Sequence, residues 1–171
     1  SKEFPNVMAM LCAGGSGRVD YGALPYFHSF WPSDNTDPLG RIKIQWGFSH
    51  FFPASTISAH VTRMGKRHLK LAIDVALSGA FGIDLALDKA TAEERVQIAD
   101  AVKLYKASIR PLVMQGELYR LVSPYEHPMA SLSYVSTDKN DAVVYLYQIQ
   151  DGSVPQVILG GLDARKNYRV E

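Results

Sequence analysis

The seven residues Trp31-Pro32-Ser33-Asp34-Asn35-Thr36-Asp37 contain the side chains of this sequence that are best suited to chemistry. They place two carboxylates within four residues of each other and close to an indole. An aromatic run, 26–31, precedes them and an apolar pattern of helical spacing follows. The stretch therefore joins the end of a buried strand to the start of a helix, where parallel α/β folds carry their catalytic groups. Asp34 is our main candidate for a functional carboxylate.

Purely structural explanations also exist for these residues. Asp37 is followed by Pro38, the usual order of a helix N-cap and first helical position, which predicts a plain cap. Asp34 could serve a turn, because aspartate is common in turns. Trp31 is either a core aromatic residue or a surface for stacking a sugar ring. Trp46 falls on the apolar stripe of the helix that follows, and we assign it to the core.

The glycine-rich segment Cys12–Arg18 is a second candidate, because glycines let the backbone approach a ligand closely. It lacks the Gly-Lys-Ser/Thr ending of a phosphate-binding loop and the spacing of a dinucleotide fingerprint. It nearly fits the Gly-x-Ser-x-Gly nucleophile elbow, but Arg18 occupies the fifth position. A simple tight turn explains it equally well. The thiol of Cys12 could act as a nucleophile or could only pack. Its candidate bases are His28, His50 and His60.

Composition and charge exclude several classes of partner. The formal net charge is +1 and the longest basic run is Lys66-Arg67-His68, so we expect no nucleic-acid partner. We see neither a signal peptide nor an apolar run of membrane-spanning length, so we expect no membrane partner. His60 and His68 lack metal-ligand spacing with a cysteine or carboxylate, and we predict neither metal nor cofactor. A single cysteine allows no internal disulfide.

Strands and helices are predicted to alternate over the first two thirds of the chain. Apolar runs at Val7–Ala13, Tyr26–Trp31, Ser49–Ala59 and Phe81–Leu87 predict strands. Helical periodicity between them predicts one helix from Asp37 or Pro38 and another over 69–77. A third helix should begin at a Thr91/Glu94 capping box and end before Pro111. This order indicates parallel strands joined by crossover helices.

The pattern changes near Arg110, where we place a domain boundary between residues 1–110 and 111–171. Partial alternation predicts strands at 118–122 and around Leu132 and Tyr134. A turn at 138–141 precedes a strongly β-prone run at 143–149, and shorter runs follow at 156–159 and 168–170. The second domain is therefore predicted to be an antiparallel sheet or part of a β-sandwich.

Several motifs occur in the same order as in a known family. Cys12-x-x-Gly15-x-x-Arg18-x-Asp20 is followed by Trp31-x-Ser33-Asp34-Asn35-Thr36-Asp37 and then by Arg41-x-x-x-Gln45-x-Gly47. Next come Pro53-x-Ser55-x-x-x-Ala59-His60-Val61, Gly82-x-x-x-Ala86-Leu87-Asp88 and Leu118-Tyr119-Arg120-Leu121-Val122-Ser123-Pro124. Together they resemble the α-galactosidases of glycoside hydrolase family 36. Ala13 and Pro32 depart from the residues that the family often has at those positions.

The resemblance implies a fold and a set of roles. The fold would be the second half of a (β/α)8 TIM barrel, strands five to eight, plus part of an antiparallel β-sandwich. Strands five to eight would be Val7–Ala13, Tyr26–Trp31, Phe51–Ile57 and Phe81–Ala86. Asp34 would be the general acid/base. Cys12, Gly15, Arg18, Trp31 and Asn35 would bind substrate.

The implied reaction is hydrolysis of α-linked galactosides of the raffinose and melibiose type by double displacement. Such a retaining mechanism needs a second, nucleophilic carboxylate. The family carries it in a Lys-Trp-Asp setting that does not occur in this sequence. We therefore expect the nucleophile to lie upstream and the chain alone to be an inactive fragment. Half a barrel leaves strand edges unpaired, so we also expect the chain to self-associate as a homo-oligomer, most simply a dimer.

Alternative functions stay open on this sequence. Galactosyl transfer within the same family would use the same residues with a sugar acceptor in place of water. A carbohydrate-binding or structural module would not need Asp34. A cysteine or serine hydrolase would need the nucleophile elbow that Arg18 interrupts.

Overall fold

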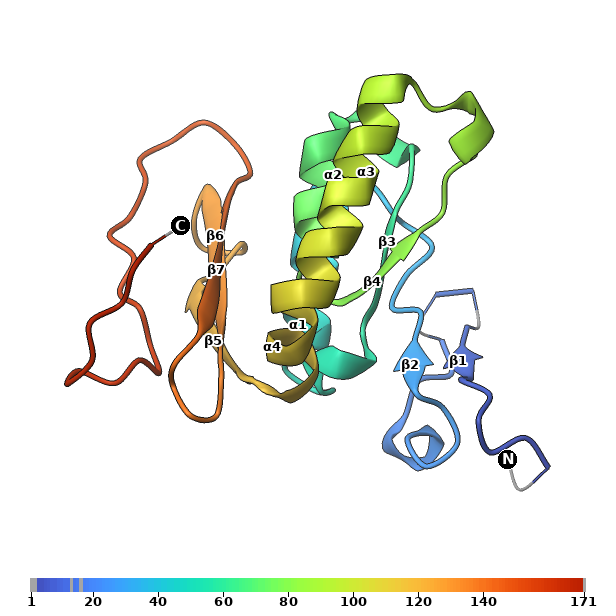
Figure 1. Cartoon of the computed structure of the whole chain (residues 1–171), viewed down its shortest axis with the longest axis horizontal. Coiled ribbons are helices and arrows are strands. Elements are labelled where there is room, and N and C mark those ends of the chain that lie inside the picture. The colour runs from blue at the N-terminus through green and yellow to red at the C-terminus, as the bar shows by residue number, and fades with distance from the viewer. Residues whose placement is uncertain (1–2, 13, 16, 171) are drawn as a thin grey trace.

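The computed structural model describes residues 3–12, 14–15 and 17–170. Ala13 and Ser16, which the predicted first strand and glycine loop include, lie outside the described residues. An α/β part comes first and an antiparallel sheet follows, as predicted (Figure 1). Among the described residues, no helix is long and apolar enough to cross a membrane.

Four short parallel strands form the scaffold of the α/β part. They are β1 (Met10–Leu11), β2 (Ser29–Phe30), β3 (Ser58–Val61) and β4 (Ala80–Ile83). β1 pairs in parallel with β2, and β3 with β4. One parallel bridge from Phe30 to Ile57 joins the two pairs. The strands thus follow one another in sequence order, and their carboxyl ends lie at the same edge.

The strands are shorter than predicted, and two predictions need correction. β1 covers only two residues of 7–13, and Val7 and Met8 are exposed, so a strand buried on both faces is wrong here. The third strand begins at Ser58 rather than at Ser49 or Phe51. Phe52 instead packs on Tyr21, Phe30 and Phe48 with ring centroids 4.8–5.5 Å apart. The apolar run therefore reflects an aromatic cluster, and a 3-10 turn, Ala54–Thr56, follows it.

The predicted helices are present as α1 (Pro38–Phe48), α2 (Leu69–Ala76) and α3 (Ala92–Leu104). Other 3-10 turns lie at Tyr21–Ala23, Met64–Lys66 and Leu87–Lys89. The capping box at the start of α3 is confirmed. The Thr91 hydroxyl accepts from the Glu94 backbone N–H, and the Glu94 carboxylate accepts from the Thr91 N–H. Both bonds satisfy donors that a helix N-terminus leaves unpaired.

The prediction that this helix ends before Pro111 is wrong. The chain continues through a π-helical segment, Tyr105–Ile109, into α4 (Arg110–Gln115). The Arg110 N–H bonds to the Tyr105 carbonyl, five residues back. Pro111 then sits in the first turn of α4, where a missing backbone N–H is tolerated. The wider turn restarts the helix and thereby accommodates the proline.

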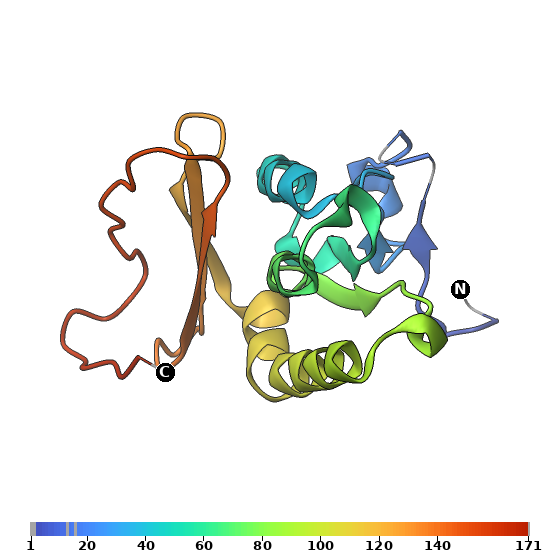
Figure 2. The same cartoon turned by 90° about the horizontal axis from the view of Figure 1, so that it is seen from above.

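The second part is a three-stranded antiparallel sheet in the order β5 (Glu117–Val122), β6 (Met129–Val135), β7 (Ala142–Gln148). The three strands predicted there are confirmed. The predicted strands at 156–159 and 168–170 are wrong. These residues form an extended loop on the side of the sheet that faces away from the α/β part (Figures 1 and 2). Ile158 is 77% exposed and Val170 95% exposed, so their β-prone side chains gain no burial from pairing.

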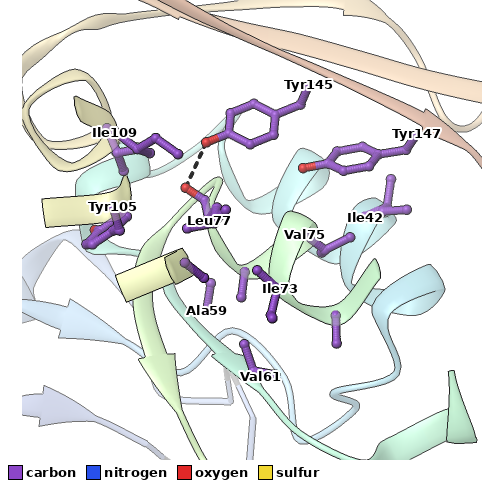
Figure 3. Close-up of a cluster of buried hydrophobic side chains, with 14 of the residues drawn as sticks. Ile42, Ala59, Val61, Ile73, Val75, Leu77, Tyr105, Ile109, Tyr145 and Tyr147 are labelled. Carbon is purple, nitrogen blue, oxygen red and sulfur yellow. Dashed lines mark hydrogen bonds between the residues drawn. The ribbon is translucent and has the colours of Figure 1, made fainter. Parts of the chain in front are cut away.

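Tyrosines join the sheet to the α/β part through one shared core (Figure 3). Near the C-terminal end of α2, the carbonyls of Asp74, Leu77 and Ser78 accept hydrogen bonds. The donors are the hydroxyls of Tyr147, Tyr145 and Tyr134, at 3.1, 2.9 and 2.7 Å. Burial raises the pKa of all three hydroxyls above 10.0, so they keep their protons and donate. Carbonyls that the helix leaves unpaired thus find partners on β6 and β7.

Replacing Tyr145 by phenylalanine should lower the free energy of unfolding by about 1–2 kcal/mol, because a buried carbonyl of Leu77 then loses its donor. Urea unfolding of the whole chain measures this change. Tyr26→Phe, at a residue that is 73% exposed, is the matched control and should have almost no effect. Equal destabilisation by the two variants would contradict the capping role.

Candidate active site

Asp34 lies just beyond β2, at the carboxyl ends of the parallel strands, and it is exposed. Its Oδ1 atom accepts a hydrogen bond from the Trp31 indole N–H at 3.0 Å. The neighbouring polar side chains make hydrogen bonds elsewhere: the side chain of Asn35 accepts from the Asp37 backbone N–H, and the hydroxyl of Thr36 accepts from that of Thr62. The orientation of Asp34 therefore depends on Trp31.

The indole of Trp31 itself contacts two side chains. The guanidinium carbon of Arg41 lies 4.5 Å from the ring centroid, and the imidazole of His60 lies 4.7 Å away. Cations and aromatic rings at these separations attract the indole. The ring is therefore fixed by α1 and β3 together.

Arg41 is only 3% exposed and binds backbone carbonyls from two segments. Its Nε donates to Asn35 at 2.8 Å, and its two terminal nitrogens donate to Ser33 at 2.9 Å and Ser58 at 3.1 Å. Burial lowers the pKa of Arg41 from 12.5 to about 10, while the negative charge of Asp34 acts in the opposite direction. At neutral pH the guanidinium is thus charged and ties the Asp34 loop to β3.

Asp37 occupies the N-cap position of α1, as predicted, but its carboxylate makes no capping hydrogen bond. It accepts from Nε of Arg67 at 3.2 Å instead. The prediction of a plain cap is therefore right in position and wrong in its contact. This carboxylate is engaged away from Asp34.

The glycine loop lies against the Asp34 loop. Gly15 is buried with φ +80°, and a Cβ atom there would lie 3.2 Å from the Cα of Ser33. The backbone carbonyl of Leu11 accepts from the backbone N–H of Trp31 at 2.9 Å, so the two segments begin side by side. Cys12 and Arg18 are both exposed. Ser16 is outside the described residues.

A cysteine–histidine pair receives no support from the geometry. His28 accepts from the Ala9 N–H through Nδ1, His60 packs on Trp31, and His50 lies edge-on to Trp46. In the described ranges none of these imidazoles is hydrogen-bonded to the Cys12 thiol. Nor do those ranges contain a group of three or more metal-binding side chains.

An open cavity of about 510 Å³ lies beside the parallel strands. Met10, Ser29, Ser58 and Gly82 line it from four successive strands, and so does His60, whose imidazole packs on Trp31. Burial lowers the pKa of His60, the charge of Asp84 opposes this effect, and Arg41 adds to it. Asp34 is not among the described residues that line this cavity, so His60 is the contact that connects the cavity with the Trp31 side of the site.

Arg41 and His60 both contact the Trp31 indole, a role predicted for neither, since His60 was considered only as a base for Cys12 or as a metal ligand. The burial of Arg41 on α1, next to Ile42, is visible only in the structure. A cation in that place requires partners, since arginine is seldom fully buried without them. The only signal in the sequence for a role of His60 at this site was its position at the end of a predicted strand. Its contact with Trp31 depends on the tertiary fold.

Parallel strands with a carboxylate beyond their carboxyl ends, followed by an antiparallel sheet, fit the class of glycoside hydrolases with an α/β barrel and a β domain. Residues 1–116 match the model of the Melibiase family. Relatives and structural neighbours are glycoside hydrolase family 36 α-galactosidases over almost the whole chain. The chain belongs to this family.

Alpha-galactosidase AgaA of Geobacillus stearothermophilus is 37% identical over 100% of this chain and 25% of its own length. Probable alpha-galactosidase G of Aspergillus terreus is 34% identical over 100% of the chain and 25% of its own length. A crystal structure of AgaA in complex with raffinose superposes with a TM-score of 0.89, 36% identity, and coverage of 96% of this chain and 24% of that one. The chain thus spans about a quarter of the length of these relatives.

Proposed function

We propose that the full-length protein is an α-galactosidase that hydrolyses α-linked galactosides of the raffinose and melibiose type. The observation that carries this proposal is the carboxylate of Asp34, held by the Trp31 N–H beyond the carboxyl end of β2. The family membership of the chain supports it, as does the raffinose complex of its relative AgaA. Asp34 serves as the general acid/base in this assignment.

The mechanism that we propose is double displacement with retention of configuration. Asp34 protonates the glycosidic oxygen as the bond breaks and later removes a proton from the attacking water. A second carboxylate attacks the anomeric carbon, and it comes from sequence outside these 171 residues. The isolated chain is accordingly inactive. Exposed Cys12, Arg18 and Asn35, together with Gly15 and Trp31, form the sugar site in this proposal.

In this proposal β1 to β4 are barrel strands five to eight. The domain boundary lies near Arg110, so that residues 111–171 begin the C-terminal β domain. The sequential order of the four parallel strands supports four consecutive barrel strands, and the antiparallel sheet that follows them supports placing these strands last in the barrel.

The direct test is to incubate the full-length protein with raffinose and follow the released galactose by proton NMR. We expect galactose to appear first as the α anomer and then to mutarotate, as retention requires. Initial release of the β anomer would refute double displacement. Absence of galactose release from any α-galactoside would refute the assigned activity.

We also propose that the isolated chain self-associates, most simply as a dimer. Over the described residues, β1 and β4 are each paired on one side only, and Met10, which lines the open cavity, is 44% exposed. Unpaired parallel edges and exposed apolar surface favour association. Sedimentation velocity of the 171-residue chain at micromolar concentration should show the dimer. A concentration-independent monomer would contradict this proposal.

A further inference from the structure

We propose that Arg41 is a positioning residue for the acid/base Asp34, acting through the loop backbone and through Trp31. This inference rests on the proposed function, because it assumes that Asp34 transfers the proton. Arg41 does not contact the carboxylate by any hydrogen bond in the described structure. Its role is to fix where the carboxylate points.

The first path runs through the backbone. Ser33 and Asn35 flank Asp34 directly, and both of their carbonyls accept hydrogen bonds from Arg41, at 2.9 and 2.8 Å. The third bond, to the carbonyl of Ser58 at 3.1 Å, connects the loop to β3. Asp34 is thus the middle residue of a three-residue segment that one guanidinium holds at both ends.

The second path runs through the indole. Arg41 lies over one face of Trp31 at 4.5 Å, and the Trp31 N–H reaches Oδ1 of Asp34 at 3.0 Å. Rotation of the indole would remove the hydrogen bond that the carboxylate receives. A single buried side chain therefore controls both the backbone and the side-chain orientation of Asp34.

The chemistry of these contacts requires arginine rather than lysine. A planar guanidinium can donate in several fixed directions and still present a flat face to an aromatic ring, whereas an ammonium group is a point charge on a flexible stem. Arg41 uses all of these properties at once, and the described structure gives it no carboxylate hydrogen-bond partner. Simple charge balance would not need this geometry.

The test is the leaving-group dependence of Arg41→Lys in the full-length enzyme. Misplacing a general acid slows substrates with poor leaving groups, whereas activated aryl galactosides need little protonation. We expect kcat for raffinose to fall on the order of 10–100-fold, with KM almost unchanged, and galactosylation by an activated aryl galactoside to fall much less. Equal loss with both substrates would overturn the positioning role.

Gln45→Met is the matched control. Gln45 lies one turn further along α1, is 6% exposed and also bonds to the backbone, at Val75 O. Its hydrogen bonds in the described structure go to Val75 and Ser78 and to no residue of the Asp34 site, so its loss should lower stability without the leaving-group signature. The same signature in Gln45→Met would refute a specific role for Arg41.

If Arg41→Lys fails to fold, Trp31→Phe still tests the path through the indole. It retains a ring next to Arg41 and removes the N–H that bonds Asp34. We expect the same selective loss on raffinose, and its absence would overturn the indole path. Asp34→Asn distinguishes failure of the proposed acid/base function of Asp34 from failure of the positioning role of Arg41. If that variant lacks the signature, the proposed function fails, and if it alone shows the signature, only the positioning role fails.

Discussion

Replacing Asp34 by asparagine in the full-length protein should lower kcat for raffinose on the order of 10²–10⁴-fold, the usual contribution of a general acid/base. The amide is nearly the same size and can still lie near the Trp31 N–H, but it cannot donate an acidic proton. Galactosylation by activated aryl galactosides should be much less affected, because their leaving groups depart without protonation. Steady-state and pre-steady-state kinetics with both substrates measure this difference.

Azide gives a second readout for the same variant. It needs no general base to attack a galactosyl-enzyme intermediate, so it should restore turnover of aryl galactosides by Asp34→Asn and yield galactosyl azide. Asp37→Asn is the control, because it makes the same chemical change at a carboxylate that accepts from Arg67. Near-normal raffinose turnover by Asp34→Asn would show that the proton donor lies elsewhere.

Replacing Gly15 by alanine should also disturb the Asp34 site. The new Cβ would lie 3.2 Å from the Cα of Ser33, so the backbone beside Asp34 must move. Displacing a catalytic group by a fraction of an ångström to one ångström can reduce turnover on the order of 10–100-fold. We therefore expect Gly15→Ala to lose kcat/KM for raffinose to that extent, as measured by galactose release.

Gly14→Ala separates this contact from backbone strain. Gly14 also has positive φ, +63°, but among the described residues a Cβ there would meet nothing within 4 Å. Both variants should lose roughly 1–2 kcal/mol of stability from the left-handed conformation. Only Gly15→Ala should also lose kcat/KM for raffinose when both variants are assayed in the folded state. Equal activity in the two variants would mean that the contact with Ser33 does not control Asp34.

Local patterns were sufficient to predict most elements of this fold. The apolar periodicity of 69–77 and the Thr91/Glu94 pair depend on neighbours within a few residues, and both gave correct helices. Apolar runs were less reliable. Phe51 and Phe52 are strongly β-prone, but an aromatic cluster with partners distant in sequence holds Phe52 outside the strand. The prediction that the helix ends before Pro111 failed because the π-helical turn upstream lets the helix continue without the backbone N–H that proline lacks.

The candidate site was predictable in part. A carboxylate between an apolar run and a helix start placed Asp34 correctly at the carboxyl ends of the strands, because that position follows from chain order. The supports of Asp34 could not be predicted in the same way. Arg41 reaches Ser58 across seventeen residues, and His60 meets Trp31 from another strand. Such contacts are set by how strands and helices pack, and a single sequence does not display them.

Helix α1 has the Asp34 loop at its start and the antiparallel sheet at its end. Arg120 of β5 donates to the hydroxyl of Ser49, the residue after α1, at 2.9 Å, and also to its carbonyl. At 1.5 Å per residue, the helix is a stiff rod of about 17 Å between the two. The sheet is therefore part of the frame that supports the Asp34 loop. Recombination between relatives would have to transfer α1 together with β5, because a crossover between them would separate Ser49 from the Arg120 that donates to it.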